Sequence, residues 1–122
     1  MSGYQATHID EIAAEKWPYW APIRHHFDIK TFGVNAWRGN DGDEVIKRHD
    51  EHESGDPELY LVLSGTALFT VGDEELNCPA GTLVFVEDPA AERLAVAKDA
   101  NTVVLSIGGG TPSGWDTGYL EG

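Results

Sequence analysis

The sequence predicts an all-β protein of one domain, in which roughly eight short strands close into a sandwich or barrel. Runs of strand-forming residues alternate with clusters of Gly, Pro, Asn and Asp, and these clusters recur about every 8–12 residues. The 122 residues are enough to bury a hydrophobic core and correspond in size to a single domain. No apolar run approaches the ~20 residues of a membrane-spanning helix, so we expect none.

Residues 1–28 are expected to form an N-terminal extension that packs on the barrel. A short helix is predicted over about residues 7–16, with Asp10 as its N-cap and Pro18 ending it. Three aromatic residues near Pro18 are expected to cover an open end of the barrel: Trp17, Tyr19 and Trp20. The segment Arg24-His25-His26 is either a contact on the pocket side or the polar start of the first barrel strand.

The barrel is predicted over residues 29–107. Its segments are rich in β-branched, aromatic and aliphatic residues and are bounded by turn residues. They are Ile29–Trp37 with Gly33 as a candidate bulge, Val45–His49, Glu58–Leu63, Ala67–Val71, Thr82–Val86, Arg93–Ala97 and Thr102–Ile107. The Gly-rich tail, residues 108–122, is either a flexible end or a strap anchored by Trp115 and Tyr119.

Acidic residues dominate the charge of the chain. Asp and Glu outnumber Lys and Arg by 21 to 8, for a net charge of −13. This charge repels phosphate backbones and anionic lipid surfaces, so we expect a small-molecule ligand as partner, with no nucleic acid and no membrane. The single Cys78 excludes an internal disulfide and is expected to be a small core residue. Since the N-terminus also lacks the features of a secretory signal, a cytoplasmic location is predicted.

The most informative segment is Glu58 to Gly65, Glu-Leu-Tyr-Leu-Val-Leu-Ser-Gly, which follows His49-Asp50-Glu51. It resembles the first motif of the cupin superfamily, in which His-x-His is followed after three or four residues by Glu and after six more by Gly. Here Glu51 replaces the second His, and six residues rather than three or four separate it from Glu58. An alternative alignment places His52 and Ser54 at the two His positions, but Pro57 argues against an unbroken strand there.

The second cupin motif is more degraded. It starts at Gly81, with fifteen residues between Gly65 and Gly81, but Glu87 and Pro89 replace its Pro and Gly. Glu92 lies at the position of the third His ligand, and a slip of one residue would place Arg93 there instead. The resemblance covers residues 29–107 and implies a double-stranded β-helix, the jelly-roll barrel of the cupins, with degenerate metal motifs. It also implies a homodimer, because lone small cupins commonly pair.

Strand alternation places Glu58 and Tyr60 on one face, and His49 and Glu51 also share a face when extended. The first hypothesis is a metal-free pocket for a small polar or anionic substrate, with His49, Glu51 and Glu58 as catalytic acid–base groups. Burial in an apolar barrel is expected to raise the pKa of Glu58 or Glu51. Three further side chains are expected to contact the substrate: Arg93, which would hold an anionic group, Tyr60 and His25. The cupin resemblance permits an activity of the isomerase, epimerase or cyclase type.

Two alternatives remain open at this point. In the first, His49, Glu51, Glu58 and Glu92 bind a divalent metal ion (Fe, Mn, Zn or Ni), as in a dioxygenase-like cupin. In the second, the barrel is a non-catalytic ligand-sensing module. Glu58 and Arg93 are also compatible with a purely structural ion pair.

Overall fold

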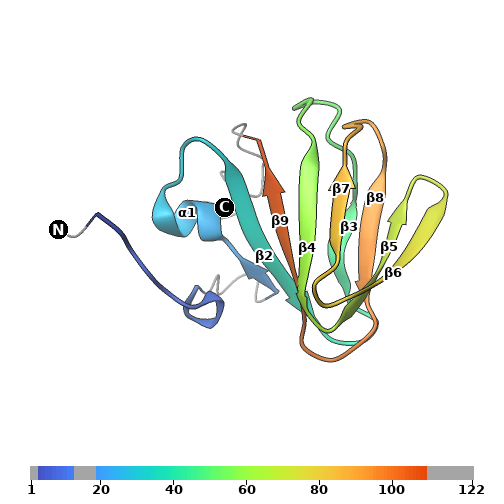
Figure 1. The fold of residues 1–122 in the computed structure, drawn as a ribbon, viewed down its shortest axis with the longest axis horizontal. Helices are drawn as coiled ribbons and strands as arrows, with labels where there is room; N and C mark the ends of the chain where they lie inside the picture. Colours follow the sequence, from blue (N-terminus) through green and yellow to red (C-terminus); the bar gives the residue numbers. More distant parts are fainter. Residues whose placement is uncertain (1–2, 13–18, 110–122) are drawn as a thin grey trace.

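The computed structural model describes residues 3–12 and 19–109, and within them the chain forms two antiparallel β-sheets. The five-stranded sheet has the order β1-β2-β9-β4-β7, and the four-stranded sheet has the order β3-β8-β5-β6 (Figure 1). Strands that follow one another in the chain often lie in different sheets, which is the double-stranded β-helix arrangement. The predicted all-β fold with a short N-terminal helical segment is therefore confirmed.

The elements have the following bounds. The strands are β1 (Trp20–Ala21), β2 (Gly33–Gly39), β3 (Glu44–His49), β4 (Glu58–Ser64), β5 (Thr66–Val71), β6 (Glu74–Pro79), β7 (Leu83–Val86), β8 (Arg93–Ala97) and β9 (Thr102–Gly108). The helical elements are the 3₁₀ turn η1 (Ile9–Glu11) and the helix α1 (Ile23–Phe27).

The space between the sheets holds the main hydrophobic core. Apolar side chains from both sheets interdigitate there, as the alternation of buried and exposed residues along each strand requires. The core residues are Val45, Ile46, Tyr60, Val62, Ala67, Phe69, Cys78, Val84, Val86, Ala95, Ala97 and Val104. Cys78 is a small buried core residue, as predicted.

The N-terminal region differs from the prediction. Over the described part of residues 7–16 the chain forms only η1, and its N-cap is His8, whose side chain accepts a hydrogen bond from the Asp10 backbone N–H at 3.1 Å. The α-helix lies further along, at α1, which the sequence reading assigned to the approach to a strand. Residues 13–18, including Trp17, and the proposed anchors Trp115 and Tyr119 lie outside the described residues.

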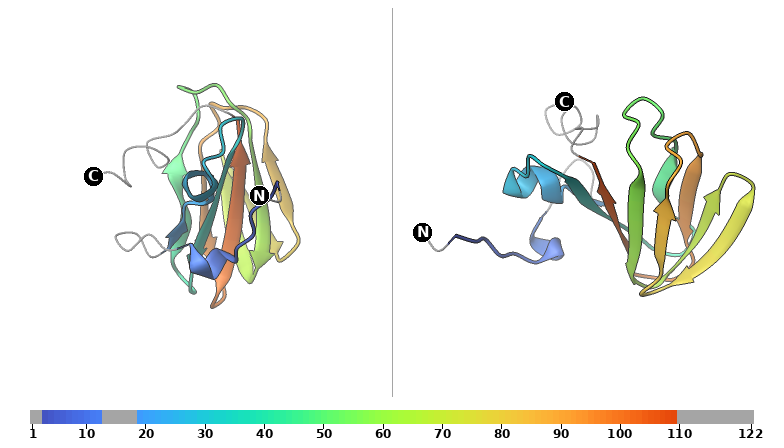
Figure 2. Two further views of the ribbon diagram at one scale, coloured as in Figure 1. Left: turned by 90° about the vertical axis from the view of Figure 1, so that its left-hand side faces the viewer. Right: turned by 45° about the horizontal axis from the view of Figure 1, so that its top comes forward.

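The N-terminal region also contributes to the five-stranded sheet. β1 pairs with β2, and Trp20 stacks on Trp37 with ring centroids 5.8 Å apart. A second small core forms around Ile12, Ala21 and Ala36. Figure 2 shows this region at one end of the molecule and the β5–β6 hairpin at the other. β2 begins at Gly33, and its register with β9 is continuous, so the expected bulge at Gly33 is wrong.

Gly65, the last residue of the motif that begins at Glu58, has a structural reason to be glycine. It connects β4 to β5 with a positive φ of 71°, which other residues rarely adopt. A Cβ at this position would also stand 2.8 Å from the Cα of Thr102. The turn therefore requires glycine both for its conformation and for the close approach of β9.

No helix in the described residues is long and apolar enough to cross a membrane.

Candidate functional site

A cavity of about 440 Å³ opens between the two sheets, within the size range of small-molecule sites. Strands β2, β9 and β4 form one wall, β3 forms the other, and the β3–β4 loop and Arg24 of α1 close its sides. The polar and charged residues that line it are Arg24, Asn35, Lys47, Arg48, His49, Asp50, Glu51, Ser54, Asp56, Glu58, Tyr60 and Ser106.

The register of the five-stranded sheet determines which side chains enter the cavity. β9 lies between β2 and β4, so inward-facing residues form rows across the three strands. The first row, at the cavity mouth, is Gly33, Gly108 and Glu58. The second is Asn35, Ser106 and Tyr60, and the third is Trp37, Val104 and Val62. The first row is thus charged and glycine-lined, the second carries polar groups, and the third is apolar.

His49 reaches this cavity because β3 is irregular. Its pairing with β8 shifts register twice, between Glu44 and Ile46 and again before His49, and such shifts change which face of the sheet a side chain points to. His49 lies opposite Arg93 in the resulting register. Its Nδ1 lies 2.6 Å from the carbonyl oxygen of Lys47, so Nδ1–H is the donor and Nε2 faces the cavity.

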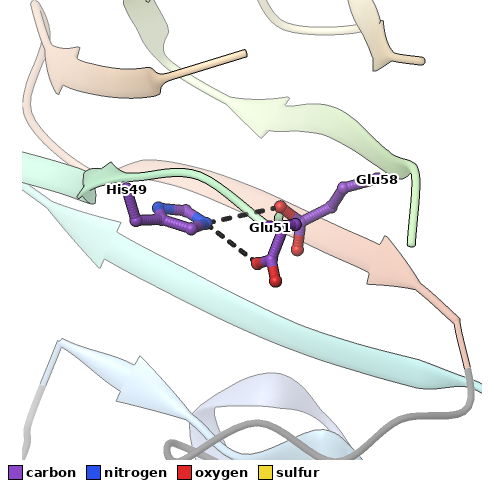
Figure 3. A group of neighbouring side chains, drawn as sticks. All are labelled: His49, Glu51 and Glu58. Carbon is purple, nitrogen blue, oxygen red and sulfur yellow. Dashed lines mark ion pairs between the residues drawn. The ribbon is translucent and has the colours of Figure 1, made fainter. Parts of the chain in front are cut away.

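His49 meets two carboxylates at the cavity mouth (Figure 3). Its Nε2 is 3.1 Å from Oε1 of Glu51 and 3.6 Å from Oε1 of Glu58. Glu51 is held in the β3–β4 loop, where its N–H donates to the carbonyl of Pro89 and its side chain accepts from Ser54 Oγ at 3.3 Å. The structure therefore brings together all three of the side chains that the sequence nominated as acid–base groups.

Oε1 of Glu58 accepts from two further donors. The hydroxyl of Tyr60 donates to it, and Arg93 Nη1 donates to it at 3.1 Å. Arg93 is completely buried, and its other donors bind the backbone carbonyls of Ala91, Asp88 and Pro89. Arg93 is not among the residues that line the cavity. It therefore positions Glu58 from behind, whereas the sequence suggested that it holds the substrate.

The protonation states follow from these contacts. Burial alone would lower the pKa of His49, but hydrogen bonds with Glu51 and Glu58 outweigh it and raise that pKa to about 10. Burial alone would raise the pKa of Glu58, but hydrogen bonds from His49 and Tyr60 and the charge of His49 outweigh it and lower that pKa. Burial and the Glu58 charge raise the pKa of Tyr60. Near neutral pH the site holds an imidazolium, a carboxylate and a neutral phenol.

The expected upward shift for Glu58 is therefore wrong. The sequence reading considered desolvation, which does act in that direction. The donors that overcome it come from β3, from β4 itself and from β8, and their convergence depends on strand register.

Three other nominated residues lie away from the cluster. Glu92 is exposed and forms an ion pair with Arg48 at 2.5 Å, so its neighbour Arg93 takes the inward position. His25 is exposed on α1 and does not line the cavity, although the preceding Arg24 does. His52 is exposed in the β3–β4 loop and pairs with Asp50.

Several polar residues of the cavity wall were not nominated as site residues, among them Ser106 and Trp37. Trp37 Nε1 donates to Ser106 Oγ at 2.9 Å, which orders the wall beside Tyr60. Alternation along β2 and β9 would have indicated that Trp37 and Ser106 face inward. For the segment Arg24-His25-His26 the sequence left open whether it contacts the pocket, and in the structure Arg24 does. The sequence could not decide this, because the approach of α1 depends on how the N-terminal region folds back.

The cupin resemblance implies a metal ion, and three side chains offer ligands for one. Single ligand atoms of His49, Glu51 and Glu58 lie within 4.8 Å of one another. The bond between His49 Nδ1 and the Lys47 carbonyl is also the arrangement that orients metal-bound imidazoles. Glu92, the fourth nominated ligand, points elsewhere, and the Arg93 guanidinium lies against Glu58. The residues therefore fit a three-ligand site but not the four-ligand site.

No protein-family model matches the sequence, and no curated protein sequence matches it. Solved structures do match. A cupin protein from Bacteroides fragilis is 21% identical with a TM-score of 0.70, over 93% of this chain and 89% of that one. An uncharacterised double-stranded β-helix protein from Klebsiella pneumoniae is 17% identical with a TM-score of 0.69, over 88% and 90%.

A candidate sugar phosphate isomerase from Acidithiobacillus ferrooxidans is 22% identical with a TM-score of 0.62. The match covers 72% of this chain and 56% of that one. Structural matches at this level of sequence identity establish the fold alone. The strand order, the rows of inward side chains and these structural matches agree, and the chain has the double-stranded β-helix fold of the cupin superfamily.

Proposed function

We propose that the cavity binds a small polar or anionic molecule and acts on it by acid–base chemistry, as an isomerase or epimerase does. The observation that carries the proposal is the position of His49 Nε2, 3.1 Å and 3.6 Å from two carboxylates at the mouth of the cavity. Paired acid and base groups at one edge of a pocket are the requirement for moving a proton within a bound substrate.

The protonation states assign the roles. Glu58 is ionised near neutral pH, and its Oε2 lies 3.9 Å from where a Cβ on Gly108 would stand, on the cavity lining. Glu58 accepts a proton from a carbon next to a carbonyl group, and the His49 imidazolium donates one to the carbonyl oxygen, which gives an enol. Where the deprotonated carbon bears a hydroxyl group, the enol is an enediol. Glu58 then delivers its proton to the former carbonyl carbon while the hydroxyl group on the neighbouring carbon returns a proton to His49, so a new carbonyl group forms there and both residues regain their starting states without a net change in oxidation state.

Charge balance supports the metal-free form of this proposal. Glu51 and Glu58 contribute two negative charges, while Arg93 and protonated His49 contribute two positive charges within hydrogen-bonding distance. The four groups are neutral together, so the cluster needs no cation to offset its carboxylates. The buried Arg93 stands near the place where the cupin resemblance expects a third imidazole.

Proton exchange provides the test. The protein is incubated in deuterated water with a panel of aldoses, ketoses and 2-hydroxy or 2-keto acids, and NMR detects deuterium at the carbon next to the carbonyl. We expect Glu58→Gln and His49→Gln to reduce exchange by about 10²–10⁴-fold, the range for general acid–base groups. Glu92→Gln, which removes an exposed carboxylate outside the cavity, is the matched control. Equal exchange rates in all variants contradict the proposal, and ligand-induced melting shifts without exchange favour a sensor.

The three-ligand cluster supports a second candidate, a metal-dependent cupin. His49, Glu51 and Glu58 would hold a divalent ion, which would polarise a bound carbonyl as a Lewis acid. His49 must lose its second proton to bind a metal, so binding would release a proton. Elemental analysis of the purified protein decides: stoichiometric Fe, Mn, Ni or Zn that is lost in His49→Ala establishes this alternative, and its absence in metal-supplemented protein excludes it.

A further inference from the structure

We propose that Arg24 is the anion-binding residue of the cavity, and that the ligand carries a carboxylate or phosphate group close to the atoms that face His49 and Glu58. That the atoms of the ligand facing His49 and Glu58 are the ones that react rests on the proposed function. The binding of an anionic group by Arg24 does not, because it follows from the α1 side of the same cavity.

Arg24 is a buried, oriented cation. Its side chain is 6% exposed and lines the cavity. Its Nε donates to the Ile29 carbonyl at 3.1 Å, and its Nη2 donates to the Lys30 carbonyl at 3.4 Å. These acceptors come within reach because Asp28, in the left-handed conformation, ends α1 and reverses the chain. Two backbone acceptors therefore fix the plane of the guanidinium, which is the preorganisation that planar anion recognition requires.

Between the Arg24 guanidinium and the Glu58 carboxylate, the floor of the cavity is formed by two glycines, which have no side chains. A Cβ on Gly33 would stand 3.3 Å from Arg24 Nη1, and a Cβ on Gly108 would stand 3.9 Å from Glu58 Oε2. Gly33 and Gly108 are directly opposite each other on β2 and β9, and Gly108 is opposite Glu58 on β4. Both glycines line the cavity.

This row sets the size of the ligand. Neighbouring strands are about 4.8 Å apart, so the two charged groups are separated by roughly one to two strand spacings, about 5–10 Å. A molecule of three to six carbon atoms spans such a gap. Its anionic group would contact Arg24 while its reacting carbon lies beside Glu58.

Three other basic side chains lie near the cavity, and each has a contact in the described residues. Arg93 is fully buried behind Glu58 and does not line the cavity. Arg48 pairs with Glu92 at 2.5 Å on the exposed side. The Lys47 ammonium lies 5.4 Å from the centre of the Tyr19 ring.

Arg24 also has to offset negative charges in the cavity wall, which would repel an anionic ligand. The Asp56 carboxylate lies beside Gly109, whose carbonyl oxygen is 3.2 Å from the Cβ position of Gly33. The carboxylates of the cavity lining would exclude an anion if Arg24 were neutral. Removal of the Arg24 charge should therefore reverse the preference of the cavity rather than weaken all binding equally.

The test compares matched ligands by calorimetry: D-glucose, D-glucuronate, which replaces one hydroxymethyl group by a carboxylate, and D-glucose 6-phosphate. Three-carbon pairs, glycerol with D-glycerate and with glycerol 3-phosphate, form a second series. We expect at least one anion to bind more tightly than its neutral counterpart. Arg24→Gln should weaken that anion about 10- to 100-fold, as expected for loss of a charge-assisted bond, and Arg24→Lys less. The carboxylate and phosphate arms identify which anion the site takes.

Gly108→Ala is the second variant, because its Cβ meets only ordinary van der Waals contacts and leaves the fold intact. It fills the floor between Arg24 and Glu58 and should also weaken anion binding. Lys98→Gln removes an exposed positive charge elsewhere and is the control, expected to match the parent protein. Anions that bind no better than neutral counterparts, or anion binding unchanged in Arg24→Gln, overturn the proposal.

Failure of this inference is distinguishable from failure of the proposed function. If anion binding depends on Arg24 but Glu58→Gln leaves proton exchange unchanged, Arg24 retains its role and the acid–base proposal fails. If Glu58→Gln abolishes exchange while Arg24→Gln leaves anion binding unchanged, the acid–base proposal stands and the role of Arg24 is overturned.

Discussion

Protonated His49 should stabilise the fold, and this stabilisation should disappear in alkaline solution. Burial alone lowers the pKa of His49, but the hydrogen bonds with Glu51 and Glu58 outweigh it and raise the pKa from 6.5 to about 10. Because the folded pKa is above the unfolded value, the contribution is fully present below pH 6.5 and is lost as the pH rises through about 10. The perturbation that isolates it is His49→Gln.

The magnitude follows from the shift and from the exposure of the ring. Each pKa unit corresponds to about 1.4 kcal/mol, so the shift from 6.5 to about 10 has an upper limit of about 5 kcal/mol. The His49 side chain is 35% exposed, and solvent screens its ion pairs. We therefore expect the free energy of unfolding to fall by about 1–2 kcal/mol over this range because of His49 alone.

Urea denaturation at a series of pH values from 6.5 to 10 measures this effect. The parent protein should lose stability over the range relative to His49→Gln, whose curve lacks this component. His25→Gln, which removes an exposed histidine of α1, should follow the parent curve. NMR titration of the His49 ring gives the pKa directly. A ring that titrates near 6.5, with parallel stability curves for parent and variant, would refute the reasoning.

Three further predictions concern other parts of the molecule. Gly65→Ala should lower the free energy of unfolding by about 2–4 kcal/mol in urea denaturation, because it introduces both a strained φ and a clash with β9. Arg93→Met should cost about 3 kcal/mol in the same assay, since it leaves Glu58 without its buried partner, whereas Arg48→Met breaks an exposed pair and should cost less than about 1 kcal/mol. The protein should be a homodimer by light scattering, because Phe85 is 57% exposed on the edge strand β7. Phe85→Asp adds a negative charge at this edge to a chain of net charge −13 and should make the protein monomeric. An unchanged mass would exclude this surface as the interface.

The strands that the sequence identified are those with strong local signals. β4, β5, β8 and β9 begin and end at residues that favour strands or turns, and the observed bounds differ from the predicted ones by one residue at most. β6 was missed because it is an exposed edge strand that begins with Glu74 and Glu75, and only Cys78 within it is buried. β1 was missed because two residues carry no periodicity. Both owe their structure to a neighbouring strand rather than to their own composition.

In the site, too, local patterns of the sequence predicted some features, whereas features that depend on distant strands could not be predicted. Alternation along β4 was sufficient to place Glu58 and Tyr60 on one face, and the structure brings His49 and Glu51 to meet Glu58. The choice between Glu92 and Arg93 was not accessible, because a difference of one residue in register reverses which of the two faces inward. The direction of the Glu58 pKa was also inaccessible, since it depends on donors 9 and 35 positions away in the chain.

The register of β8 turns Arg93 inward and places its guanidinium against Glu58. An imidazole at this position would add a metal ligand, whereas the guanidinium adds a permanent positive charge against Glu58. Burial would raise the pKa of Glu58, but hydrogen bonds from His49 and Tyr60 lower it, and the charges of His49 and Arg93 act in the same direction. Arg93 also binds Oε1 of Glu58, which leaves Oε2 on the cavity side near Gly108. Arg93 thus places beside Glu58 a positive charge of the kind that a bound metal ion would also provide.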